Sequence, residues 1–445
     1  MPLSVAVIGS GPAGYYTTEA LVKDLGEAVR IDIIDRLPTP YGLIRGGVAP
    51  DHQSIKAVAK RFEKTNSLDN VRFLGNVAVG EAVSVEELRQ LYDAVVLAVG
   101  APVDRRLGIP GDDLPGVIGS AQFVGWYNAH PDFADLDPDL DIDAAAVIGN
   151  GNVAIDCARV LAKTPAEMAT SDLAPHAARR IHASPLRTIH LFGRRGPLEA
   201  SFTPKELGEL GELDDCAPIV DPGQLPSQSD DMEPVIKKNL AHLHAFSGNR
   251  PGLKRKTLDI VFYARPVAVL GDGRVTGLKL ERTQVVDGRC LGTGATFEVA
   301  CGLVIPCIGY VTPPLPGVPH DQARGCFANK DGVIAPGLYC TGWARRGPSG
   351  TIGTNRPDGF EVAGHIGKHI APSGKQGGAG LDALLRARAV AVISFADWKR
   401  IEAAEIDAAV DGAPRRKFAT RADLMAALKR PGQAAGHHGE KAVLP

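Results

Sequence analysis

The first part of the chain alternates between runs of apolar residues and one segment of helical periodicity. Residues 3–8 and 31–35 are rich in valine and isoleucine, and a helical pattern that begins near Gly11 separates them. A continuous apolar run at 94–101 predicts a further strand covered on both faces, as in a parallel sheet. The order strand, helix, strand therefore predicts a parallel sheet packed between helices, in a first unit at residues 1–104.

A second unit with the same pattern is predicted at residues 105–308. Its apolar strands are expected at 146–148 and 188–193, and another buried strand at 303–310. The stretch between the first two strands is long for one strand–helix–strand unit. We therefore expect an inserted loop at 164–184.

Within the second unit, residues 257–300 alternate apolar and polar positions between glycine-containing turns, which predicts an antiparallel excursion.

The rest of the chain, residues 309–430, is predicted to return to the first unit. Residues 337–343 predict a strand that enters a loop, and helix-forming residues dominate 382–429. The tail at 431–445 is expected to be disordered. The second unit is thus predicted to be inserted into the first.

A glycine-rich turn joins the first strand to the first helix. It contains Gly9, Gly11, Pro12, Ala13 and Gly14. In a G-x-G-x-x-G turn the glycines permit a tight turn, close approach of a pyrophosphate and close packing of the helix on the strand. The helix N-terminus attracts the phosphates. Asp35 ends the next strand, where a carboxylate accepts hydrogen bonds from ribose hydroxyls. We expect a dinucleotide site here, and the spacing from Gly9 to Asp35 favours FAD over NAD.

The second unit has its own glycine turn, with the opposite charge at its far end. The turn contains Gly149, Asn150, Gly151, Asn152 and Val153. Ala154 stands at the position of the third glycine, and the strand at 188–193 runs into Arg194 and Arg195. Guanidinium groups bind phosphate bidentately and stay charged, so the arginine pair predicts a site for the 2′-phosphate of NADP. The predicted fold class is α/β with two Rossmann-like dinucleotide-binding domains, the NADP-binding domain inserted into the FAD-binding domain.

Composition and charge argue against several other classes of protein. The 445 residues carry a net charge of -2, with 44% hydrophobic and 22% charged residues, which does not suggest nucleic-acid binding. No apolar run reaches the roughly 18 to 20 residues that cross a bilayer. The first strand begins at Leu3, which leaves no room for a leader, so we expect a cytoplasmic protein. The seven cysteines form no C-x-x-C pair and no spacing typical of zinc or iron–sulfur sites.

Longer runs of residues carry a more specific signal. The runs at 9–14, 41–52, 149–156, 193–203 and 339–352 together resemble the adrenodoxin reductase-type family of ferredoxin–NADP reductases, over nearly the whole chain. The resemblance implies that FAD contacts Ala13, Asp35, Leu43 and Val79. It implies that the isoalloxazine end is covered by Trp343, Gly350, Thr351 and Ile352. It implies that NADP contacts Asn150, Gly151, Asn152, Val153, Arg194, Arg195, Glu206 and Gly350.

Three residues, Trp343, His52 and Glu209, raise separate expectations. Trp343 stands where many flavin reductases with two dinucleotides have an aspartate, and its flat ring suits packing against a flavin while its N–H needs a partner if buried. The resemblance places His52 close to the flavin, and we expect His52 and Glu209 to tune the flavin site, because histidine changes charge near neutral pH. A purely structural His–carboxylate pair, and a solvated Glu209, stay open as alternatives.

The function implied by the resemblance is electron transfer. NADPH delivers a hydride to FAD, which then passes electrons one at a time to a ferredoxin or adrenodoxin-like iron–sulfur protein. Such partners are typically acidic, so a basic docking patch is expected at Lys237, Lys238, Arg250, Lys254, Arg255 and Lys256. The alternatives are an NADPH-dependent flavin monooxygenase, for which no motif is present, and a non-catalytic nucleotide sensor or electron-input flavoprotein subunit of a larger complex.

Overall fold

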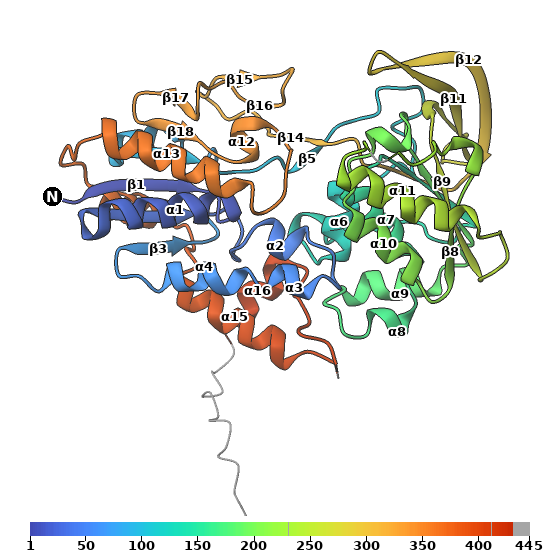
Figure 1. Ribbon diagram of the computed structural model, residues 1–445. Coiled ribbons are helices and arrows are strands. Elements are labelled where there is room, and N and C mark those ends of the chain that lie inside the picture. The colour runs from blue at the N-terminus through green and yellow to red at the C-terminus, as the bar shows by residue number, and fades with distance from the viewer. Residues whose placement is uncertain (230, 411, 430–445) are drawn as a thin grey trace, which may run out of the picture.

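Two parallel sheets form two units that lie side by side (Figure 1). The computed structural model describes residues 1–229, 231–410 and 412–429, so the tail predicted at 431–445 lies outside the described residues. Each unit has its own apolar core, one around β1 and β2 and the other around β6 and β7. The predicted fold class is confirmed.

The first sheet holds strands from both ends of the sequence. Its order is β17-β18-β4-β1-β2-β3, and every pair is parallel except β17 with β18. The bounds are β1 Leu3–Ile8, β2 Val29–Ile34, β3 Val71–Leu74, β4 Ala94–Leu97, β17 Val333–Ala335 and β18 Leu338–Cys340. Both β1 and β4 are buried at every position, which explains why all their residues except Ser4 are apolar. Because β18 pairs with β4, the chain returns to the first sheet after it has formed the second.

The second sheet is parallel throughout, in the order β13-β6-β7-β9-β8. The bounds are β6 Ala144–Ile148, β7 Thr188–Phe192, β8 Cys216–Val220, β9 Lys256–Val261 and β13 Leu303–Pro306. An antiparallel sheet of β10 Ala264–Leu270, β11 Gly277–Val286 and β12 Arg289–Ala300 extends from this unit (Figure 1). The antiparallel excursion predicted at 257–300 therefore begins later than expected, because its first residues belong to the parallel strand β9.

The chain crosses between the two units twice. The crossings are β5 (Val103–Asp104) and β14 (Tyr310–Val311), and they pair antiparallel with Tyr310 opposite Asp104. A short pair of strands, β15 (His320–Asp321) and β16 (Cys326–Phe327), precedes the return to the first sheet.

Helices cover both sheets, and α1 and α13 pack against each other (Figure 1). In the first unit the bounds are α1 Pro12–Leu25, α2 Leu43–Gly46, α3 Gln53–Lys56, α4 Ala59–Asn66, α5 Val85–Leu91, α12 Trp343–Arg346 and α13 Asn355–His369. In the second they are α6 Ser120–Tyr127, α7 Asn152–Ala162, α8 Pro165–Met168, α9 Pro175–Ala183, α10 Pro204–Glu209 and α11 Pro234–Ser247. The stretch predicted as an inserted loop, 164–184, thus contains two helices. No helix within the described ranges is long and apolar enough to cross a membrane.

The predicted C-terminal helices are α14 Gly377–Ala387, α15 Phe395–Asp407 and α16 Arg421–Ala427. The helix α14 packs against α5 and β1, whereas α15 and α16 lie beneath the first unit (Figure 1). Lys417, between α15 and α16, is buried and pairs with Asp172 of the second unit at 3.2 Å, while Asp172 also pairs with Lys56 of the first at 2.5 Å. Asp172 therefore links the second unit both to the C-terminal segment and to the first unit.

Candidate functional site

The turn after β1 leaves an open space at the N-terminus of α1. Gly9 has φ +107°, and a side chain there would collide with the carbonyl oxygen of Ala98. Gly14 packs so closely on the Gly9 carbonyl that a Cβ does not fit. At Gly11 the nearest atom to an added Cβ lies 4.0 Å away, so the backbone at the helix N-terminus stays accessible. The three glycines have the geometry that a dinucleotide-binding turn requires.

Residues 41–43 lie directly against this turn, although they are distant in sequence. The backbone N–H of Tyr41 donates to the carbonyl oxygen of Ser10 at 2.9 Å. Leu43 begins α2 and is 46% exposed. Val79 is partly buried against the core that contains the ends of β1 and β2. These are the places where a cofactor bound to the first turn would meet side chains, so the FAD contacts of Leu43 and Val79 stay predictions that fit the geometry.

Asp35 lies where the sequence predicts it, directly after β2, but it already has partners. Its carboxylate accepts hydrogen bonds from the backbone N–H of Ser10 at 2.8 Å, the Ser10 hydroxyl at 2.5 Å and the backbone N–H of Leu37 at 2.9 Å. Asp35 therefore fixes the glycine turn itself. Each carboxylate oxygen can accept more than one hydrogen bond, so its predicted contact with a ribose stays open to test.

Trp343 lies beside the same turn, because the backbone of the preceding residue, Gly342, comes close to the start of α1. Gly342 packs against the side chain of Ala13 at the start of α1, and α12 begins with Trp343. The indole N–H donates to the carbonyl oxygen of Ser349 at 3.0 Å, and the ring stacks on Tyr310 with centroids 6.0 Å apart. The partner that we expected for this N–H is therefore a backbone carbonyl. The turn at 350–352, which precedes α13, lies beside it, with Gly350 and Thr351 exposed.

The second glycine turn repeats the geometry of the first. Gly149 has φ +147° and lies against the carbonyl oxygen of Cys307, the residue that follows β13. The helix α7 begins at Asn152, and the buried Ala154 takes the close-packing position. The Asn152 side chain accepts the backbone N–H of Thr203 at 2.8 Å, which ties the loop after β7 to this turn. Asn150, Gly151, Asn152 and Val153 thus surround one helix N-terminus.

Arg194 and Arg195 follow β7, as the sequence predicts, just as Asp35 follows β2 in the first unit. Arg194 is exposed and Arg195 half-buried. Within the described ranges, no hydrogen bond, ion pair or ring contact joins either guanidinium to another residue. Two cations without a protein counter-charge beside a dinucleotide-type turn suit a phosphate monoester.

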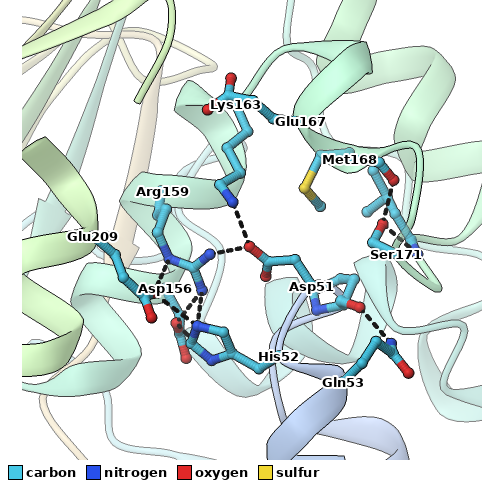
Figure 2. A network of polar contacts seen from close by, with 12 residues as sticks. Asp51, His52, Gln53, Asp156, Arg159, Lys163, Glu167, Met168, Ser171 and Glu209 are labelled. Atoms are coloured by element: carbon cyan, nitrogen blue, oxygen red, sulfur yellow. Dashed lines mark hydrogen bonds and ion pairs between the residues drawn. The ribbon is translucent and has the colours of Figure 1, made fainter. Parts of the chain in front are cut away.

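A cluster of charged side chains lies where the two units meet (Figure 2). His52 comes from the loop before α3, Asp156 and Arg159 from α7, and Glu206 and Glu209 from α10. The His52 Nε2 atom lies 2.8 Å from Glu209 Oε2 and 2.9 Å from Arg159 Nη2. A protonated Nε2 donates to the carboxylate, whereas an unprotonated Nε2 accepts from the guanidinium. The proton on one ring nitrogen therefore decides which unit-spanning hydrogen bond forms.

The cluster shifts the proton affinities of its members in opposite directions. Burial disfavours the charged form of His52, but the hydrogen bond to Glu209 and the charges of Asp156 and Glu206 outweigh it and raise the pKa of His52. Burial and the neighbouring Asp156 raise the pKa of Glu206 from 4.5 to about 7. For Glu209, burial is outweighed by His52 and Arg159, so its pKa is lowered. Groups with pKa values pushed apart near neutral pH are typical of sites that hold or move protons.

Arg159 was not expected from the sequence and is the centre of the cluster. Its side chain is 1% exposed, and it pairs with Asp51 and with Asp156, the latter at 2.8 Å. Although His52, Glu206 and Glu209 offer ligand atoms within 4.8 Å of one another, the guanidinium already supplies the positive charge there. The spacing of Asp156 and Arg159, one turn apart on α7, was the available sequence signal.

The predicted docking patch is partly wrong. Lys256 begins β9 and is 3% exposed, and its ammonium group donates to the carbonyl oxygens of Leu161 and Ala162 at the end of α7. Burial lowers the pKa of Lys256, and a partner protein does not reach it. Lys254 donates to the Leu213 carbonyl oxygen. The exposed residues of the patch are Lys238, Arg250 and Arg255, with Lys237 and Lys254 half-buried.

The cysteines form no disulfide, and the thiols of Cys157 on α7 and Cys307 after β13 lie within hydrogen-bonding reach of each other. All seven are free, with Cys157, Cys216, Cys301, Cys326 and Cys340 buried and Cys290 and Cys307 half-exposed. Burial raises the pKa of the Cys216, Cys301 and Cys340 thiols to about 12, so these three stay protonated near neutral pH.

Comparison with known proteins gives full-length matches. Residues 3–188 match the family described as pyridine nucleotide-disulphide oxidoreductase. The chain is 39% identical to NADPH-ferredoxin reductase FprA of Mycobacterium tuberculosis, over 95% of this chain and 98% of that protein. It is 38% identical to the mitochondrial NADPH:adrenodoxin oxidoreductase of Arabidopsis thaliana, over 96% of this chain and 95% of that protein. A solved structure of M. tuberculosis FprA in complex with NADPH covers 97% of this chain and 100% of its own, with a TM-score of 0.92 and 38% identity.

Proposed function

The chain belongs to the adrenodoxin reductase-type family of ferredoxin–NADP reductases, and on this basis we propose that it is an FAD-dependent NADPH:ferredoxin oxidoreductase of the EC 1.18.1 class. The resemblance seen in the sequence is confirmed by these full-length relatives. The observation that carries the proposal is the pair of dinucleotide turns, one followed by Asp35 and the other by Arg194 and Arg195, in two units that meet at His52.

The residues present fit both dinucleotides. The accessible backbone at Gly11 and the N-terminus of α1 suit the pyrophosphate of FAD, while Trp343 offers a flat ring beside the same turn. Bound at this turn, FAD would supply the redox chemistry that joins hydride transfer from NADPH to single-electron transfer to a small iron–sulfur protein. The chain's part is to bind both cofactors and to hold a proton at His52 Nε2, where Glu209 accepts its hydrogen bond.

NADPH is distinguished from NADH by the arginine pair after β7. We expect Arg194→Ala/Arg195→Ala to raise KM for NADPH far more than KM for NADH, because only NADPH has a 2′-phosphate. Loss of charge-assisted hydrogen bonds is worth roughly 1.5 to 3 kcal/mol, which corresponds to about 10- to 150-fold. The measurement is steady-state reduction of ferricyanide with each nucleotide. An unchanged ratio of the two KM values would contradict the assignment.

The whole reaction is tested by stopped-flow spectroscopy of the purified holoprotein. Mixing with NADPH should bleach the flavin absorbance, and a second mixing with a ferredoxin from the same cell should restore it as the ferredoxin is reduced. Flavin reoxidation that depends on oxygen and yields an oxygenated product would instead favour a flavin monooxygenase. Reduction of the flavin with negligible transfer to every candidate ferredoxin would favour an electron-input subunit.

The iron–sulfur partner is proposed to dock near α11 and the turn that follows it. Lys238 and Arg250 are exposed there, and an acidic partner would be steered by them. We expect Lys238→Glu/Arg250→Glu to raise KM for ferredoxin at low salt and to leave ferricyanide reduction unchanged. The matched control is Lys429→Glu, an exposed lysine on the other unit. Equal losses in both assays, or an equal loss in the control, would exclude this docking surface.

Three statements stay predictions from the sequence. They are the domain limits at 1–104, 105–308 and 309–430, the cytoplasmic location, and the individual cofactor contacts. Among the last, Glu206 as an NADP contact is supported by its place on α10, 3.7 Å from His52, and by a buried carboxylate oxygen that has no hydrogen-bond partner within the described residues.

A further inference from the structure

The backbone carbonyl of Arg194 is held by two side chains from a distant hairpin. The Thr283 hydroxyl on β11 donates to this carbonyl oxygen at 2.7 Å, and the Cys290 thiol on β12 donates to it at 3.0 Å. The two donors lie about a hundred residues further along the chain. Thr283 is buried and Cys290 is half-exposed. Two donors converge on the one peptide group that precedes Arg195.

The pairing of β11 with β12 brings these two donors to the same face. Val285 pairs with Cys290 and Thr283 pairs with Gly292, so Thr283 and Cys290 are diagonal neighbours across the two strands. An irregularity follows directly, because the next pair is Glu281 with Thr296. Bulges of this kind turn side chains toward a target that a regular ladder would miss.

The neighbouring peptide groups of the arginine turn are also fixed by backbone contacts. The backbone N–H of Tyr263, directly before β10, donates to the Arg195 carbonyl oxygen at 3.3 Å, and the backbone N–H of Gly196 donates to the Glu199 carboxylate at 2.9 Å. Thr283 also donates its own backbone N–H to the Tyr263 carbonyl oxygen at 2.9 Å. The turn is thus tied to the antiparallel sheet through main chain and side chain, while both guanidinium groups remain without protein partners in the described ranges.

We propose that Thr283 and Cys290 are positioning residues that aim Arg194 and Arg195 at the 2′-phosphate of NADPH, so that the β11–β12 hairpin sets the preference for NADPH over NADH. This inference rests on the proposed function, in which the arginine pair binds that phosphate. A fixed backbone lowers the entropy cost of ordering two long side chains around a ligand. Both side chains donate to the backbone of the arginine turn, so we expect them to affect recognition of the phosphate and to leave kcat unchanged.

The test compares variants that remove a donor with variants that keep it. Thr283→Val and Cys290→Ala remove the hydrogen bonds at nearly constant shape, whereas Thr283→Ser and Cys290→Ser retain a hydroxyl donor. Thr293→Val is the matched control, because Thr293 is exposed on the same hairpin and donates to the Arg282 carbonyl oxygen. Two readouts are used on the holoprotein: KM and kcat with NADPH and NADH, and calorimetric affinity for adenosine 2′,5′-bisphosphate against ADP.

We expect Thr283→Val/Cys290→Ala to weaken adenosine 2′,5′-bisphosphate binding and to raise KM for NADPH about 3- to 10-fold, which corresponds to roughly 0.6 to 1.4 kcal/mol. ADP affinity, KM for NADH and kcat should stay within twofold. Of the two single variants, Thr283→Val should weaken binding more than Cys290→Ala, because a thiol is a weaker hydrogen-bond donor than a hydroxyl. The Ser variants and Thr293→Val should match the wild type.

The outcomes separate this inference from the function on which it rests. If Arg194→Ala/Arg195→Ala abolishes the preference but the double hairpin variant keeps it, the positioning role is overturned and phosphate recognition stands. If the double variant weakens the binding of NADH and ADP as much as that of NADPH and adenosine 2′,5′-bisphosphate, the hairpin acts on general stability and the inference is overturned. The same holds if Thr293→Val weakens binding as much as the double variant does. If the arginine variant keeps the preference, phosphate recognition by this turn is overturned as well.

Discussion

Replacement of Glu206 by glutamine should stabilise the protein at alkaline pH and leave its stability unchanged at acid pH. The Glu206 carboxylate is 9% exposed and faces Asp156 and Glu209 as well as His52, so burial and negative neighbours raise its pKa from 4.5 to about 7. A folded-state pKa above the unfolded one means that the folded state binds the proton more tightly. The contribution is fully favourable below pH 4.5 and is lost as the pH rises through 7.

The size of the effect follows from the same shift. Each unit of pKa is worth about 1.4 kcal/mol, so the carboxylate at pH 8.5 costs at most about 3 kcal/mol relative to its neutral form. Because the amide of glutamine has the shape of the neutral carboxyl group, Glu206→Gln removes this cost at pH 8.5 and changes little at pH 5. The assay is thermal unfolding of the holoprotein at both pH values, with the exposed Glu212→Gln as control. The reasoning would be refuted if Glu206→Gln raised Tm no more at pH 8.5 than at pH 5. It would also be refuted if Glu212→Gln raised Tm at pH 8.5 by the same amount.

Three further predictions concern other parts of the molecule. Glu209→Gln should lower the pKa of His52 by about one unit, measured by NMR titration of the imidazole, because the hydrogen bond to a charged acceptor is lost; an unchanged titration would contradict the pair. Lys417→Met should destabilise the protein by about 3 kcal/mol in chemical unfolding, since it leaves a buried carboxylate short of a partner, whereas Lys429→Met at the surface should be neutral. Gly14→Ala should abolish flavin retention on gel filtration, because its Cβ collides with the preceding turn; retained absorbance at the flavin band would argue against that packing.

Local patterns carried most of the fold prediction. The buried strands β4 and β6 are visible as unbroken apolar runs and β1 as a run interrupted only by Ser4. Each glycine turn is recognised because a short sequence determines a strand–turn–helix geometry. The stretch at 164–184 shows where a local signal was available and missed. Thr164 and Glu167 form a capping box in which each side chain bonds the other's backbone N–H, a sequence signature of a helix start.

Lys256 shows a second missed signal. In the sequence it belongs to a run of three basic residues, which are usually solvent-exposed. In β9, however, Lys256 shares a face with Leu258 and Ile260, and all three are buried. The period of two therefore predicts an inward lysine, and its ammonium finds the unpaired carbonyls at the end of α7, where a cation is favoured.

The charge cluster could be predicted only in part. His52 and Glu209 were singled out, and the structure places them 2.8 Å apart although 157 positions separate them; whether they tune the flavin is a prediction still to be tested. Arg159 gave no signal of burial, because a charged residue within a helix is usually exposed. Its burial depends on Asp51, which the other unit supplies, and such contacts between units leave no periodic trace in the sequence.

The two strands by which the chain crosses between units are neighbours. Because Asp104 of β5 pairs with Tyr310 of β14, about two hundred residues leave the first unit and return to it at adjacent backbone positions. Segments whose ends lie so close are tolerated as insertions. We therefore expect that the second unit can be replaced by that of a homologue through two adjoining junctions, provided that the buried Asp51–Arg159 contact between the units is kept.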